Sequence, residues 1–190
     1  MNGFTAIAGF GESLREELQR KMDEAFPDDH VVVTMDSPKT IQDNNQTENR
    51  LLSFSIYKII ENADLRNEPP FINEKSEINR SIALDIHFLL TAYGPDPSTI
   101  LLILGRTQQI LHNMVLSGSL LEQSLEGTDQ SIKITQQPLS NESITQMWQA
   151  MECSMRLALY YLATPVEIGL APLESAEPVS SRQVGSGGSA

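Results

Sequence analysis

Apolar residues alternate with other residues along the stretch from Ser81 to Tyr93. A strand would place one set of alternate side chains on a single face: Ile82, Leu84, Ile86, Phe88 and Leu90. The other face would carry a mixture that includes Asp85 and His87. Gly94 and Pro95 follow and end the run, because proline cannot donate to a strand ladder. The pattern therefore predicts a long central strand with one buried face.

Similar patterns predict the remaining elements. Strands are expected over residues 30–35, 51–60, 131–137 and 153–168, and loops over 36–50 and 116–129. Helices are expected over residues 4–26, from about residue 99 to 115, and over 140–151. We expect Gly9 and Gly11 to weaken the first helix before Glu12, and Ser98 and Ser140 to cap the other two. Pro165 in the last strand indicates an edge, a bulge or a bend.

The order of these elements predicts the fold class. Strands and helices do not alternate regularly, which favours an α+β layer, with helices packed on one face of a mainly antiparallel sheet. Residues 1–168 would form one domain. Residues 169–190 are rich in Pro, Ser, Glu and Gly, so we expect an extended C-terminal tail there.

Charge and composition narrow the classes of function. The formal net charge of −12 argues against nucleic-acid binding, since no basic stripe is present to neutralise phosphates. The longest apolar run, residues 100–104, is too short to span a bilayer, and no signal-peptide pattern opens the chain. Cys153, the single cysteine, excludes an internal disulfide and fits a reducing compartment. We expect a cytoplasmic protein.

Candidate chemistry is sparse. Asp85 and His87 lie two residues apart on one strand face, but a lone Asp-x-His is a weak metal signal and a structural pair is the more common reading. His112 and Cys153 have core-like neighbours, and Trp148 is expected to be a core anchor. We predict no catalytic residue, no metal and no cofactor. The alternative is a small metal-dependent enzyme that uses the three polar residues Asp85, His87 and His112.

A long segment between two strands favours an interaction protein. Residues 61–80 contain two prolines and no clear period, and loops of this length are usually functional or disordered. The flanking strands can pair as an antiparallel hairpin with this segment as an extended tip. Such protrusions commonly contact partners.

Four blocks in order carry a resemblance to a known family. They are ENADLRN at 61–67, IALDIHFLLTAYG at 82–94, LILGRTQQILH at 102–112, and Trp148 before a strand with Arg156, Leu157, Tyr160 and Tyr161, followed by Pro178 to Arg182. Together they resemble the cap, or tube-terminator, family of extracellular contractile injection systems, the phage-tail-like particles of the antifeeding-prophage type. The resemblance extends over about residues 5 to 182.

The resemblance implies a fold like that of phage tail terminators and a structural role. Members are expected to form a homohexameric ring that ends the inner tube, closes the baseplate-distal end and contacts the last sheath ring. They carry no catalysis and no cofactor, and they assemble in the cytoplasm into a particle that can be released. The alternative within the same particle is a tube or baseplate adaptor.

The same resemblance points to interface residues. Asn62, Arg66 and Asn67 match the family block at the mouth of the long loop, and we predict that they order it against a neighbouring subunit. A clasp within one chain is an equally good reading. The tail from Gly169 to Arg182, with Pro178 and Arg182 as its matching residues, is predicted to lie along a neighbouring subunit or the sheath.

Overall fold

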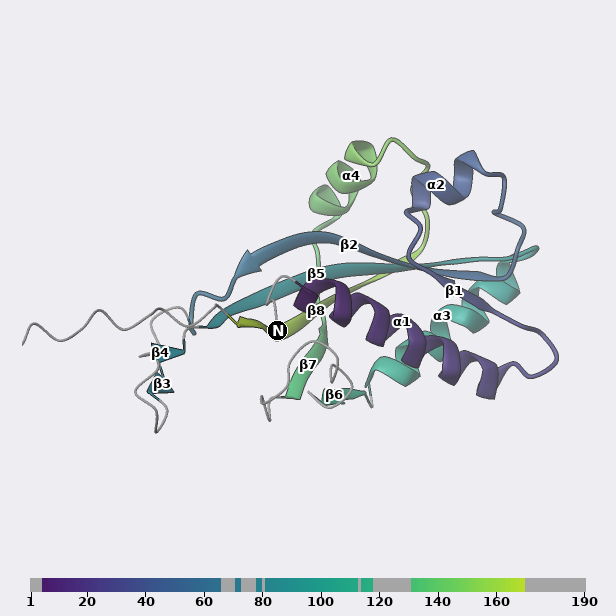
Figure 1. Ribbon diagram of the computed structural model, residues 1–190. Coiled ribbons are helices and arrows are strands. Elements are labelled where there is room, and N and C mark those ends of the chain that lie inside the picture. Colours follow the sequence, from purple (N-terminus) through teal and green to yellow (C-terminus); the bar gives the residue numbers. More distant parts are fainter. Residues whose placement is uncertain are drawn as a thin grey trace, which may run out of the picture.

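A six-stranded sheet organises the computed structural model, which describes residues 5–65, 71–72, 78–79, 81–112, 114–117 and 131–169 (Figure 1). The strand order across the sheet is β1-β2-β5-β8-β7-β6. These strands are β1 (Val32–Thr34), β2 (Leu51–Glu61), β5 (Ser81–Tyr93), β6 (Val115–Ser117), β7 (Ser131–Gln136) and β8 (Ala158–Gly169). Only β1 runs parallel to its neighbour, so the sheet is mainly antiparallel, as predicted.

The predicted central strand is confirmed. β5 has 13 residues and pairs with β2 on one side and β8 on the other. Phe88 lies opposite Ile56 and Tyr161, in the middle of both ladders. Between β2 and β5, two short strands pair in a separate two-stranded sheet, β3 (Phe71–Ile72) and β4 (Ile78–Asn79). The antiparallel pairing of β2 with β5 therefore makes the hairpin that the sequence predicted.

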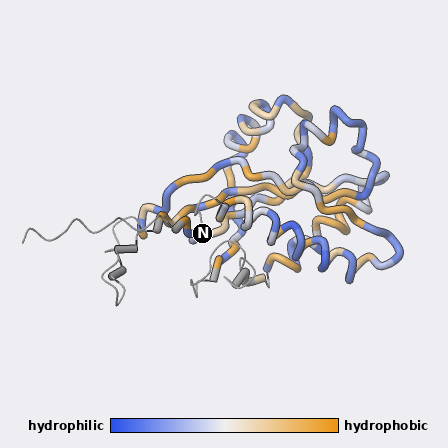
Figure 2. Tube along the Cα trace, in the orientation of Figure 1, coloured by the Kyte–Doolittle hydropathy of each residue, from blue (hydrophilic) through white to orange (hydrophobic). Residues whose placement is uncertain are grey.

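Aromatic side chains fill the centre of the core on the face of β5 that carries Phe88. Its ring lies 5.2 Å from that of Phe54, 6.2 Å from that of Phe10 and 5.8 Å from that of Tyr161, measured between centroids. Figure 2 shows the apolar residues concentrated along the central strands and the adjoining helices. Because such contacts add to the gain from burial, this cluster fixes how the first helix sits on the sheet.

Helices cover both faces of the sheet, so the prediction of one covered face was wrong. α1 (Ala6–Ala25) and α3 (Pro97–His112) lie on one side, and α2 (Pro38–Asp43) and α4 (Asn141–Ala150) on the other (Figure 1). Tyr161 packs in the main core, while its neighbour Tyr160 points the opposite way and accepts a hydrogen bond from Trp148 of α4. Trp148 is buried, which confirms its role as a core anchor.

The first two helices differ in detail from the prediction. α1 begins at Ala6, close to the predicted start at residue 4, and Gly9 and Gly11 do not interrupt it. Gly11 is buried where a β-carbon would meet the Met35 side chain. Phe10, Leu14, Leu18 and Met22, which recur at three- and four-residue steps, are buried, and Ile7 on the same stripe is partly buried. α2 lies in a stretch predicted to be a loop; Ser37 caps it and Pro38 occupies its first turn. Ser140 caps α4, as predicted.

The segment around α3 also differs. Asp96, not Ser98, caps the helix: its carboxylate accepts hydrogen bonds from the backbone N–H groups of Ser98 and Thr99, at 2.9 and 3.0 Å. These bonds and those from the two hydroxyls hold the pKa of Asp96 well below its usual range. α3 ends at His112, and the residues after it form β6 instead of continuing the helix.

The last strand is shorter at its start than predicted. β8 begins at Ala158 because a turn follows α4, and it lies inside the sheet between β5 and β7. The register of β8 against β5 shifts next to Pro165, so the bulge is the correct reading of that proline. Among the described residues, none of the helices is both long and apolar enough to cross a membrane.

Candidate interaction surfaces

Asn62 ties the end of β2 to the two strands beside it. Asn62 is the first residue after β2, and its backbone N–H donates to the carbonyl oxygen of Ala83 in β5 at 2.8 Å. Its side-chain Nδ2 donates to Oδ1 of Asp85 at 2.8 Å and to Oγ1 of Thr164 at 3.1 Å. The Thr164 hydroxyl donates to the same carboxylate oxygen. The amide therefore joins β2, β5 and β8 at one point.

The other end of the same amide turns the chain away from the sheet. Oδ1 of Asn62 accepts the backbone N–H groups of Asp64 and Leu65, each at 3.0 Å. An asparagine that bonds the backbone two and three residues ahead stabilises a turn. Asn62 thus forms a clasp within the chain at the mouth of the long segment. Its predicted contact with a neighbouring subunit stays a prediction, and Arg66, Asn67, Pro178 and Arg182 lie outside the described residues.

Asp85 and His87 share a strand face, as predicted, but bind different partners. Nδ1 of His87 lies 2.9 Å from Oε1 of Gln137, within hydrogen-bond distance. The His87 ring lies 6.0 Å from the ring of Tyr57, whose pKa is raised by burial. Both Nε2 of His87 and the Tyr57 hydroxyl are buried without a hydrogen-bond partner among the described residues. Asp85 and His87 therefore belong to separate polar contacts and do not bond to each other.

His112 does not join them. It lies in α3, which packs on the Phe88 face of the sheet, whereas Asp85 and His87 point to the opposite face. Within the described ranges, no group of three or more His, Cys, Asp or Glu side chains is placed to hold a metal ion. Sequence spacing alone could not separate these three residues; the strand register and the position of α3 do.

Arg156 stacks on a buried tyrosine on the same side of the sheet as α2. Its guanidinium carbon lies 4.9 Å from the centroid of the Tyr93 ring. Burial raises the pKa of Tyr93 to about 12, although Arg156 acts in the opposite direction. Tyr93 packs with Ile41 and Leu51 in a second, smaller core. Arg156, one of the residues in the fourth sequence block, therefore makes a structural contact within the chain.

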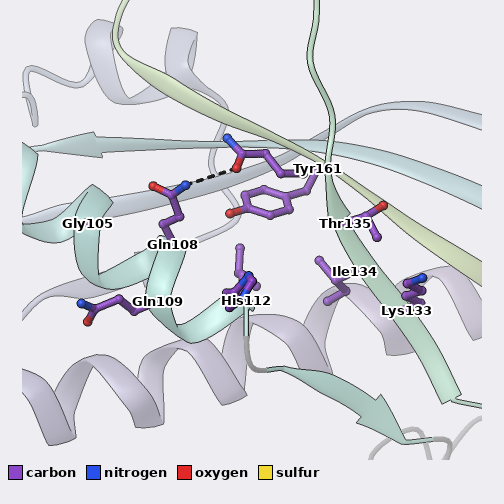
Figure 3. Close-up of a pocket in the computed structure, with 10 residues that line it drawn as sticks. Gly105, Gln108, Gln109, His112, Lys133, Ile134, Thr135 and Tyr161 are labelled. Carbon is purple, nitrogen blue, oxygen red and sulfur yellow. Dashed lines mark hydrogen bonds between the residues drawn. The ribbon is translucent and has the colours of Figure 1, made fainter.

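A groove of about 700 Å³ lies between α3 and β7 (Figure 3). Its helix wall carries Gln108, Gln109 and His112, and its strand wall carries four successive residues, 133–136. Nε2 of Gln108 donates to Oε1 of Gln136 across the two walls, at 3.2 Å. None of the described residues that line the groove is acidic, although the whole chain has a net charge of −12.

Several large apolar side chains are exposed near these features. Ile59 and Ile60 in β2 are 41% and 40% exposed, and Leu101 and Leu102 in α3 are 59% and 62% exposed. Helical spacing alone would place Leu101 and Gln108 on one stripe with Leu104 and Leu111, but Leu101 and Gln108 face solvent. The buried stripe runs through Ile103, Leu104, Thr107, Ile110 and Leu111. Exposed apolar pairs of this kind are typical of surfaces that another protein covers.

Comparison with known proteins decides the family. The model of the Pvc16 N-terminal domain family matches residues 10–182, nearly the whole chain. The chain belongs to this family. The tube-terminator family predicted from the four sequence blocks is thereby confirmed. No curated protein matches the chain.

Two solved structures share the fold of this Pvc16 N-terminal domain. One is the sheath/tube terminator of the extracellular contractile injection system PVC in its extended state, with a TM-score of 0.65 and 19% identity over 97% of this chain. The other is the tube-terminating cap of the anti-feeding prophage, with a TM-score of 0.60 and 18% identity over 91% of this chain. The chain spans 64% and 60% of those two proteins. The predicted terminator-like α+β fold is confirmed.

Proposed function

We propose that this chain caps the inner tube of a contractile injection particle. The observation that carries the proposal is the family match over residues 10–182, supported by a fold shared with two tube terminators along almost the whole chain. In the proposed particle, a homohexameric ring of this domain binds the last ring of tube protein and stops elongation. The same ring closes the end away from the baseplate and contacts the last sheath ring.

The side chains support a structural role in this proposal. Asp85 and His87, the best candidates for chemistry in the sequence, are engaged by Asn62 and Thr164 and by Gln137. The exposed apolar pairs and the groove are features of binding surfaces. We therefore assign the chain a structural role in a particle that is assembled in the cytoplasm and afterwards released.

The proposal is tested by deleting the gene for this chain and imaging the particles by negative-stain electron microscopy. We expect tubes of variable length whose baseplate-distal ends are open, and restoration of uniform, closed particles by the wild-type gene. Particles of unchanged length with closed ends would contradict the proposal. Particles that lose their baseplates instead would identify the chain as a baseplate adaptor.

A further inference from the structure

Among the described residues, no strand pairs with the outer edge of β7 beyond Lys133. β6 pairs only with residues 131–133 of β7. Lys133, Ile134, Thr135 and Gln136 all line the groove beside α3 (Figure 3), although successive side chains of a strand point to opposite faces. The groove therefore borders the edge of β7, and the backbone of residues 134–136, which β6 does not cover, can pair with a further strand.

The outer edge of β2 is open as well, on the opposite margin of the same sheet. β1 pairs only with residues 51–53 of β2, and the structure describes no other strand on that side. Farther along β2, Ile59 and Ile60 are both about 40% exposed, although they point to opposite faces. Single chains usually protect such apolar edges with charge, proline or a covering element. Charged residues flank the pair, Lys58 and Glu61, but two adjacent exposed isoleucines on a strand edge are typical of a surface that another protein covers.

The directions of the strands make these two edges complementary. β2 is antiparallel to β5, β5 to β8 and β8 to β7, so β2 and β7 run in opposite directions. A second copy placed beside the first with its sheet in the same orientation would set its β2 antiparallel to β7 of the first. The covered parts, at β1 and β6, would then lie at opposite ends of the junction and leave it clear.

We propose that neighbouring copies of this chain join through β2 of one copy and the β7 edge of the next. With the two sheets in the same orientation, antiparallel pairing can set Ile60 of one copy opposite Thr135 of the next, in the part of β7 that β6 does not cover. It also covers Ile59 on the side of the sheet that carries α3 and the groove, and Ile60 on the opposite side. The contact uses a different surface on each copy, so it repeats from copy to copy and closes into a ring when the rotation allows.

This inference rests on the proposed cap and specifies how its ring is held together. The test uses cysteine cross-linking in assembled particles. The side chains of Ile60 and Thr135 point to the same face of the sheet, the face of Asp85 and His87. Ile60 lies directly opposite Asp85, and Thr135 is aligned with His87 through Leu162. The variant carries Cys153→Ser, Ile60→Cys and Thr135→Cys. A short bismaleimide cross-links the two new cysteines even if the strand register differs by one residue from the proposed one. A control pairs Ile60→Cys with Glu142→Cys, which is exposed at the start of α4.

We expect a ladder of covalent multimers from the Ile60/Thr135 variant and none from either single cysteine or from the control. Capped particles that give no ladder would overturn the edge pairing and leave the proposed function intact. Cross-linking by Ile60→Cys alone would show that β2 pairs with β2, which also overturns it. Closed ends in the deletion strain would instead count against the cap itself, whatever the cross-linking result.

A substitution that introduces a charge tests the same contact between copies independently of cross-linking. Ile60→Lys places a charge on the proposed contact at an exposed position, so we expect loss of the cap from particles while the purified chain keeps its circular dichroism spectrum. Leu102→Lys is the matched variant on the exposed face of α3. Loss of the cap with Leu102→Lys but not with Ile60→Lys would overturn the proposal and assign the ring contact to α3.

Discussion

Replacing Asn62 by alanine is expected to lower the free energy of unfolding by about 2 kcal/mol. The change removes the bond from Nδ2 to the Asp85 carboxylate, the bond to Thr164, and the acceptor for two backbone N–H groups. A hydrogen bond to a charged group contributes about 1.5–3 kcal/mol and a neutral one about 1 kcal/mol. Because Asn62 and its partners are only partly buried, water replaces some of these bonds, which brings the expected loss to about 2 kcal/mol.

Urea unfolding followed by circular dichroism measures this loss. Asn141→Ala is the matched control, since Asn141 is the exposed first residue of α4 and undergoes the same chemical change. A loss for Asn62→Ala within about 0.5 kcal/mol of the loss for Asn141→Ala would refute the idea that Asn62 clasps the three strands.

Asn62→Asp gives a second test with a distinct pH dependence. It places a carboxylate beside Asp85, and two like charges at hydrogen-bond distance raise the pKa of the pair above the value in the unfolded chain. Stability is then retained at low pH, where one proton is shared, and is lost as the pH rises through the raised pKa. We expect this variant to be less stable than Asn62→Ala at pH 7 and to recover on acidification. A pH profile parallel to that of Asn62→Ala would contradict the geometry.

Three further predictions concern the fold. Phe88→Ala should cost about 4 kcal/mol in urea unfolding, because it removes a fully buried ring that contacts three other rings; a cost below about 1 kcal/mol would contradict the assignment of Phe88 to the centre of the core. Asp96→Ala should lower the melting temperature at neutral pH and flatten its fall between about pH 4 and pH 2. The reason is that the depressed pKa of the Asp96 carboxyl stabilises the fold above the pKa of the unfolded chain, and this stabilisation is lost as the pH falls. A melting temperature that falls with pH as steeply as in the wild type would contradict this. Trp148→Phe should cost about 1 kcal/mol by removing the hydrogen bond to Tyr160, and wild-type tryptophan emission should shift to the red on unfolding; an already red-shifted native emission would place Trp148 in water.

The strongly alternating strands could be predicted from sequence because their periodicity reflects burial directly. In β5 the predicted face from Leu84 to Leu90 is the buried one, and the alternating residues Leu52, Phe54 and Ile56 of β2 contribute to the same core. Ile60, which alternation places on the same face, is exposed because the register shifts between Ile56 and Lys58. The first helix was predictable for the same reason. Gly11 was expected to weaken this helix, but propensity alone does not show the close approach to Met35 that a glycine allows there.

The helices on the second face could not be placed in this way. α4 buries a single residue, Trp148, so its pattern does not say which face of the sheet it covers. α2 has six residues and a polar sequence; Ser37 followed by Pro38 was the available signal. α3 is apolar around most of its first two turns, so periodicity did not identify its buried stripe. Pro97 at its first position indicated Asp96 as the cap.

The candidate surfaces depend on contacts that are distant in the chain. Asn62 was identified through the family block, but its bonds to Asp85 and Thr164 follow from the register of three strands. The groove requires α3 to lie beside β7, and its residues come from segments more than 20 positions apart. Open strand edges likewise depend on the order of strands in the sheet, which no local pattern encodes.

The most direct test of the cap assignment is a cryo-electron microscopy reconstruction of the baseplate-distal end of the native particle. We predict a ring of six copies with this fold, seated on the last tube ring and touching the last sheath ring. Density for this chain at the baseplate, or a distal end closed by another protein, would contradict the assignment.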